Sequence, residues 1–129
     1  MELYAYVIMP SHIHLIARNK DGKLNEIIRD FKSVTAKEII KEILNSGIES
    51  RKEWMLDMFK DYASKLRQNK EYMFWQKTNH PTELFNPKVM NQKIEYIHNN
   101  PVEAGYVSAP ENYVYSSAYS CPKIEVWAV

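Results

Sequence analysis

Two apolar segments near the start of the chain, residues 3–9 and 12–17, are separated only by Pro10 and Ser11. Two runs of this kind around a tight turn are typical of an antiparallel β-hairpin. The polar residues 19–22 then favour a loop. We therefore expect the chain to begin with two paired strands.

The second of these segments carries two histidines, His12 and His14. Alternate residues of a strand point to the same face, so the two imidazoles are expected to lie side by side. By the same alternation, Ile13 and Leu15 are expected to face the other way, toward a core. Two imidazoles on one rigid element would form a two-point metal site, although for the pair alone two ordinary strand histidines are the more common explanation.

Apolar residues recur at helical spacing over residues 24–44, and Thr35 marks either a kink or a break in that helix. A second amphipathic helix is expected to begin after Ser50 and Glu53, which have capping-box spacing, and to end near Gln68.

Later segments of the sequence predict a third strand, a third helix and a C-terminal tail. The short aromatic run at 73–76 is expected to form the strand. Asn86 and Pro87 are a strong helix start, with Asn as the cap and Pro in the first turn, and Pro101 is expected to end that helix. Residues 112–119, rich in Tyr and Ser, are expected to form a packing arm.

Length, charge and composition limit the classes of protein to which the chain can belong. The 129 residues, 45% of them hydrophobic, suffice for one compact domain. The net charge of +1 gives no overall basic footprint, and an excess of Lys and Arg over residues 18–70 fits either phosphate contacts or a solvated face. Cys121 is the only cysteine, which excludes an internal disulfide. No apolar run reaches the ~20 residues of a membrane span and no signal peptide is apparent, so we expect a cytoplasmic protein.

The helix expected to start at Pro87 carries Tyr96 and Asn100, which are four apart and therefore share one face. Ile94 and Ile97 lie on a different face and can anchor the helix in a core. Two histidines with a tyrosine and an amide make a coherent set for phosphoryl transfer, in which a metal polarises a phosphate and the phenolic oxygen attacks phosphorus.

These residues stand in two longer motifs. The segment MPSHIHLI at 9–16 resembles the His-hydrophobic-His (HUH) motif. The segment EYIHNNPVEAGYV at 95–107 resembles the one that carries the catalytic tyrosine in REP-associated tyrosine transposases, which belong with the insertion-sequence single-tyrosine transposases. The resemblance spans residues 4–117, and FWQ at 74–76 and DFK at 30–32 fit it.

The resemblance implies a ferredoxin-like α+β sandwich with an antiparallel sheet, formed by residues 1–129 as a single domain. It implies His12, His14 and Asn100 as ligands of Mg²⁺ or Mn²⁺, although Asn before Pro is also a common helix stop. It implies Tyr96 as the nucleophile that cleaves and rejoins single-stranded, hairpin-forming DNA through a 5′-phosphotyrosine intermediate.

Family members generally have a further strand and helix before the HUH segment, so we expect an N-terminally shortened sheet with an unpaired edge near the histidines. A second copy of the chain could cover this edge, which makes a homodimer a hypothesis. Two other functions stay open: a catalytically inactive nucleic-acid-binding remnant and a small zinc protein.

Three further residues, Lys32, Gln76 and His80, are candidate DNA contacts. A solvated helix face explains Lys32 nearly as well. His98 could also approach the site or DNA, but a solvent-facing or loop position is the more ordinary interpretation of both His80 and His98. Trp75 is a candidate for core packing or for base stacking, with core packing favoured.

Overall fold

One antiparallel hairpin is followed by three α-helices in the computed structural model, which describes residues 1–66 and 70–129. The α+β class is confirmed, but no ferredoxin-like sandwich is present, because the described residues form only a two-stranded sheet. The elements are β1 (Glu2–Ile8), β2 (Ile13–Arg18), α1 (Leu24–Asn45), α2 (Lys52–Lys65), α3 (Pro87–Glu103) and a short 3-10 helix, η1 (Pro110–Asn112).

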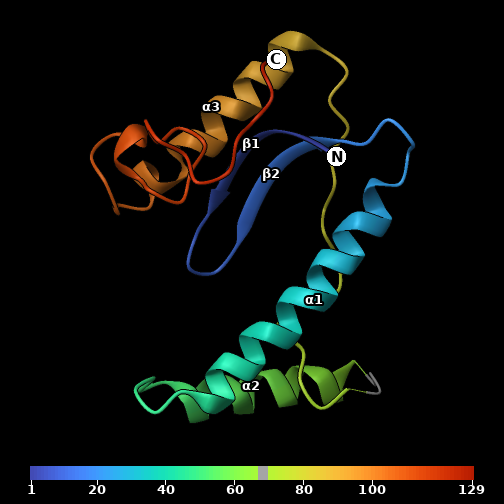
Figure 1. Cartoon of the computed structure of the whole chain (residues 1–129), viewed down its shortest axis with the longest axis vertical. Helices are drawn as coiled ribbons and strands as arrows, with labels where there is room; N and C mark the ends of the chain where they lie inside the picture. The colour runs from blue at the N-terminus through green and yellow to red at the C-terminus, as the bar shows by residue number, and fades with distance from the viewer. Residues whose placement is uncertain (67–69) are drawn as a thin grey trace. The chain divides into compact units, whose positions relative to one another are not determined.

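The contacts of the chain divide into two compact units. Unit 1 consists of Met1–Leu24 and Thr82–Val129, and unit 2 consists of Asn25–Pro81. In Figure 1, unit 1 comprises the blue hairpin and the ochre-to-red C-terminal part, and unit 2 runs from cyan through green to yellow. The hairpin and α3 therefore belong to the same unit, although about seventy residues of sequence separate them.

The hairpin has the expected antiparallel pairing, with Val7 opposite His14 and Ala5 opposite Ile16. Paired residues share a face, so the histidine face is also the face of the buried cluster of Ala5, Val7, Met9, Ile16 and Ile97. Ile13 and Leu15 lie on the opposite face and are only partly buried. The prediction that these two residues face the core cluster is therefore wrong, because α3 covers the histidine side.

Helix α3 begins as predicted. The Asn86 side chain accepts a hydrogen bond from the Lys88 N–H at 2.8 Å, and Pro87 stands in the first turn. Its apolar stripe, with Ile97 buried and Ile94 partly buried, packs against the hairpin cluster. Figure 1 shows α3 beside the hairpin. Burial of one such side chain contributes about 1.5–3 kcal/mol, so this stripe holds the helix on the sheet.

Pro101 does not end α3, which continues to Glu103. A proline in the last turn removes only one internal hydrogen bond, and the Pro101 ring is buried. The helix stops at Gly105, whose φ of +77° is easily adopted by glycine. The Gly105 N–H donates to the Val102 carbonyl and the Tyr106 N–H to the Pro101 carbonyl, which is the Schellman pattern.

The C-terminal segment packs along the outer edge of β1, as expected for a packing arm. The Ile8 N–H donates to the Tyr115 carbonyl at 2.9 Å, and the Ser117 N–H donates to the Tyr6 carbonyl at 3.0 Å. Further along, the Trp127 N–H donates to the Leu3 carbonyl at 2.8 Å. The edge of β2 has no strand partner within residues 1–66 and 70–129, and its coverage by a second copy stays a prediction.

In unit 2, α1 is continuous through Thr35, whose hydroxyl donates to the Phe31 carbonyl one turn earlier at 2.7 Å. Residues 73–76 are not a strand, because their aromatic side chains pack on helices instead. Phe74 contacts Phe59, and the Trp75 indole N–H donates to Thr35 Oγ1 at 2.8 Å. This confirms the packing role of Trp75.

The predicted capping box is absent, since α2 is preceded by Arg51 without a side-chain cap. The predicted helix end at Gln68 lies outside the described residues. None of the described helices is long and apolar enough to cross a membrane.

One hydroxyl fixes the C-terminal arm to β1 and α3. Ser117 Oγ accepts from the Tyr6 N–H at 3.0 Å and donates to the Tyr6 carbonyl at 3.2 Å. His98 Nε2 lies 2.8 Å from the same oxygen. A hydroxyl has a single proton, so His98 is the donor in this third contact.

Ser117→Ala should lower the free energy of unfolding by about 1–3 kcal/mol, because it leaves the Tyr6 N–H and His98 without their partner. Chemical denaturation followed by circular dichroism measures this change. Ser120→Ala, at an exposed position of the same segment, is the control and should change the unfolding free energy little. Equal stability of the two variants would contradict the role of Ser117.

Candidate functional site

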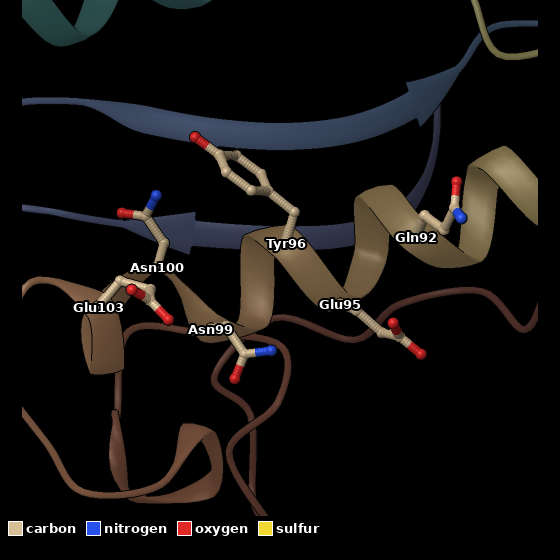
Figure 2. Close-up of a pocket in the computed structure, with 6 residues that line it drawn as sticks. All are labelled: Gln92, Glu95, Tyr96, Asn99, Asn100 and Glu103. Carbon is tan, nitrogen blue, oxygen red and sulfur yellow. The ribbon is translucent and has the colours of Figure 1, made fainter.

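Packing of α3 on the hairpin brings together the four side chains that the sequence singled out. The rings of His12 and His14 have centroids 5.0 Å apart, and those of His14 and Tyr96 are 5.6 Å apart in an edge-to-face arrangement. His12 Nε2 lies 3.1 Å from Asn100 Oδ1. Figure 2 shows Tyr96 and Asn100 projecting from α3 toward the strands, whereas Glu95 and Asn99 point to the other side.

His12 immediately precedes β2, and both of its ring nitrogens take part in hydrogen bonds. An amide oxygen can only accept, so His12 Nε2 donates to Asn100 Oδ1. In this tautomer Nδ1 accepts from the Ser11 hydroxyl, at a distance of 3.1 Å. Ser11 and Asn100 therefore fix the ring orientation of a side chain that is otherwise exposed to solvent.

His14 is partly buried under α3, and this burial lowers its pKa below the ordinary value of 6.5. The charges of His12 and Lys93 lower that pKa further. His14 is therefore neutral at neutral pH, which is the state in which an imidazole nitrogen can bind a metal ion.

Tyr96 is 56% exposed although it lies beside His14. The Lys93 ammonium lies 5.6 Å from the centroid of the Tyr96 ring, one turn earlier on α3. No described residue hydrogen-bonds the Tyr96 hydroxyl, which is therefore open to an incoming ligand. An exposed, oriented phenol with a cation nearby is suited to meet an anionic group.

An open depression extends from Tyr96 and Asn100 along α3, as Figure 2 shows. The other residues that line this depression have polar or acidic side chains: Gln92, Glu95, Asn99 and Glu103. The lining on the Glu95 and Glu103 side would repel phosphates. We therefore expect an anionic ligand to approach Tyr96 from the side of Lys93 and the histidines.

The donor set at this site consists of two imidazoles and one amide oxygen. Among residues 1–66 and 70–129, no three His, Cys, Asp or Glu side chains gather closely enough to hold a metal ion. Any metal would therefore need Asn100 and further oxygens from water or substrate beside His12 and His14. This open set differs from a closed structural zinc site, which is typically built from four Cys or His ligands.

The candidate DNA-contacting residues lie in the other unit. Lys32 Nζ donates to the Gln76 carbonyl and to Asn79 Oδ1, so its ammonium is used inside unit 2. His80 has a φ of 49° and its Nε2 lies 3.1 Å from Thr78 Oγ1. Their role in DNA binding stays a prediction. His98 is a structural residue that contacts Ser117 rather than the site.

Sequence reasoning missed two residues of the site, Lys93 and Ser11. Lys93 is three residues before Tyr96, a helical spacing that could have revealed it. Ser11 adjoins His12, but its contact depends on the turn geometry.

Comparison of the chain with protein-family models, with curated proteins and with solved structures finds no match. The assignment of a function therefore depends on the motifs and on the geometry of this site.

The pKa of His14 should rise in Lys93→Met, because removing a nearby positive charge stabilises the imidazolium. It should stay below 6.5, since burial is the larger cause of the lowered value. NMR titration of the imidazole C–H signals measures this shift, and Lys88→Met, at an exposed lysine in the first turn of α3, is the control.

In the unfolded chain His14 binds its proton more readily, so the free energy of unfolding should fall as the pH drops from above 6.5 through the folded-state pKa.

For the NMR titration, an unchanged His14 pKa in Lys93→Met would contradict the proximity of the Lys93 ammonium to the His14 ring.

Proposed function

We propose that this protein is a metal-dependent single-tyrosine transposase that cleaves and rejoins single-stranded, hairpin-forming DNA. The observation that carries the proposal is the meeting of His12, His14, Tyr96 and Asn100 on one face of unit 1, with the His14 and Tyr96 rings 5.6 Å apart. The packing of an apolar hairpin against a helix distant in the sequence does not by itself require these four side chains to converge. We further propose that the hairpin and α3 correspond to part of the ferredoxin-like sandwich of the HUH transposases.

The separation of His12 Nε2 and Asn100 Oδ1 supports a divalent cation. Mg²⁺ holds its ligands at about 2.0–2.1 Å in octahedral geometry, so neighbouring ligand atoms lie about 3 Å apart. The observed 3.1 Å fits two neighbouring ligands once the proton between them is lost. His14 would be the third ligand, and its lowered pKa keeps it free of a competing proton. When bound, the cation would supply Lewis-acid polarisation of the scissile phosphate.

In the proposed reaction Tyr96 Oη attacks phosphorus. A bond forms between Oη and phosphorus while the bond from phosphorus to the 3′ oxygen breaks. The phenolic proton leaves, and the released 3′ oxygen takes up a proton to give a free 3′-OH. One phosphoester replaces another, so the reverse reaction with a new 3′-OH rejoins the strand without ATP.

The chain's own residues contribute mainly position and charge. Packing of Ile94 and Ile97 fixes the rotation of α3, which directs Tyr96 toward His14. Lys93 adds a positive charge near the ring, where phosphate oxygens and a developing phenolate would both be stabilised. Such preorganisation is the main source of catalysis in phosphoryl transfer.

The second candidate is a nucleic-acid-binding module without catalysis. The observation that favours it is the exposure of both Tyr96 and His12, because phosphoryl transfer benefits from exclusion of water. Such a module would bind hairpin DNA in a salt-sensitive manner and leave the strand intact.

With Mn²⁺ or Mg²⁺, a hairpin oligonucleotide labelled at its 3′ end should become covalently attached to the protein, whereas a 5′ label should be released on a fragment with a free 3′-OH. Tyr96→Phe should abolish the adduct, because it removes the attacking oxygen, and Tyr119→Phe should retain it. Denaturing gel electrophoresis measures both products. Binding without any adduct, over varied metals and hairpins, would identify the inactive module instead.

His14→Asn should weaken Mn²⁺ binding by about tenfold or more, since it removes one of two imidazole ligands. Electron paramagnetic resonance of free Mn²⁺ measures this change. His80→Asn, a histidine of unit 2, is the matched control and should bind Mn²⁺ as the wild type does. Tight Zn²⁺ retained through purification, with no affinity for DNA, would favour the zinc protein.

A further inference from the structure

Three tyrosines of unit 1 form a contiguous aromatic surface that the proposed chemistry does not use. The rings of Tyr106 and Tyr113 have centroids 6.3 Å apart, and those of Tyr113 and Tyr115 are 6.0 Å apart. The Lys123 ammonium lies 5.4 Å from the centroid of the Tyr115 ring. We call these four residues the tyrosine platform.

The platform is open to solvent at both ends. Tyr106 is 55% exposed and Tyr115 is 49% exposed, whereas the central Tyr113 is partly buried. The rings of Tyr113 and Tyr115 meet edge to face, and those of Tyr106 and Tyr113 are tilted by 44°. Neither arrangement stacks one ring flat on another, so ring faces remain available to a planar ligand.

Backbone and side-chain contacts hold the platform rigidly. The Tyr113 hydroxyl donates to the Ile8 carbonyl at 2.9 Å, and the Ile8 N–H donates to the Tyr115 carbonyl at 2.9 Å. The Tyr106 N–H closes the Schellman motif of α3 on the Pro101 carbonyl. A preorganised aromatic surface loses little conformational freedom on binding.

These contacts also make the platform continuous with the candidate site. Ile8 is the last residue of β1, and the turn that follows it leads to His12. Pro101, which anchors Tyr106, directly follows Asn100. A chain bound at Tyr96 therefore has the platform on the same rigid unit, next to the His12 turn and the C-terminal end of α3.

The chemistry of the platform matches single-stranded DNA. Exposed aromatic rings stack on bases without regard to sequence, and a lysine among them can pair with the backbone phosphates. Burial raises the pKa of the Tyr113 hydroxyl, and Tyr106 and Tyr115 raise it further, so Tyr113 stays neutral and does not repel phosphate.

We propose that Tyr106, Tyr113 and Tyr115, with Lys123, form a stacking site for unpaired bases that flank the DNA held at Tyr96. The identity of the partner rests on the proposed function, which makes single-stranded DNA the substrate. The stacking site itself requires neither the metal nor the Tyr96 hydroxyl.

Fluorescence anisotropy of a labelled thymidine oligonucleotide of about 12 nucleotides tests the proposal, with EDTA present so that no cleavage occurs. Tyr106→Leu and Tyr115→Leu should each weaken binding by about tenfold, because each removes one stacking surface. Lys123→Gln should lower the salt slope of binding by about one phosphate contact. Tyr119→Leu, a tyrosine of the same arm outside the platform, is the control for both leucine variants.

The same oligonucleotide carrying 5-iododeoxyuridine should crosslink on irradiation to Tyr106 or Tyr115, as located by mass spectrometry of the peptides. Circular dichroism verifies that each variant is folded. Wild-type affinity in both leucine variants, or crosslinks only outside the platform, overturns the stacking site.

The two proposals fail in different ways. Loss of binding in the leucine variants with no covalent adduct in the wild type would leave the stacking site standing and remove the transposase chemistry. An adduct at Tyr96 together with unchanged binding in those variants would do the reverse.

Discussion

The packing of α3 on one face of the hairpin is the interaction on which the rest of unit 1 depends. A two-stranded hairpin is marginally stable alone, so its apolar face needs a covering layer. Ile97 supplies that layer by joining the cluster of Ala5, Val7 and Ile16. Because the histidines share this face, the contact that stabilises the fold also places Tyr96 beside His14.

Local signals could be predicted well from the sequence. The hairpin followed from its apolar alternation, and the start of α3 followed from Asn86 and Pro87, whose capping contact is present. The helical repeat alone predicted that Tyr96 and Asn100 share one face of α3. These features involve residues that are close in sequence, where backbone geometry fixes the outcome.

The sequence predicted less where the outcome depends on which distant surface covers a segment. Ile13 and Leu15 were expected to face the core, but alternation tells only that a strand has two faces and not which one α3 covers. The aromatic run at 73–76 was expected to be a strand, but Phe74 and Trp75 find their partners on helices. Pro101 was expected to end α3, but the helix continues past it, because a proline is tolerated at this buried position in the last turn.

At the site, the hydrogen bond between His12 and Asn100 gives these two side chains a defined geometry. It satisfies the hydrogen-bonding groups of an exposed histidine and a partly buried asparagine, and it holds Nε2 and Oδ1 3.1 Å apart. A cation would have to displace the proton on Nε2, and the Ser11 hydroxyl can then reverse its role from donor to acceptor at Nδ1. Little reorganisation is therefore needed, because one proton changes place rather than a backbone segment.

The discontinuity of unit 1 has a consequence for synthesis on the ribosome. About eighty residues separate Ile16 from Ile97, so the hairpin emerges roughly 4–16 seconds before its covering helix at ordinary translation rates. Unit 2 is complete during that interval, whereas the histidines stay without the tyrosine. The nascent chain therefore cannot assemble the candidate site until translation has passed α3.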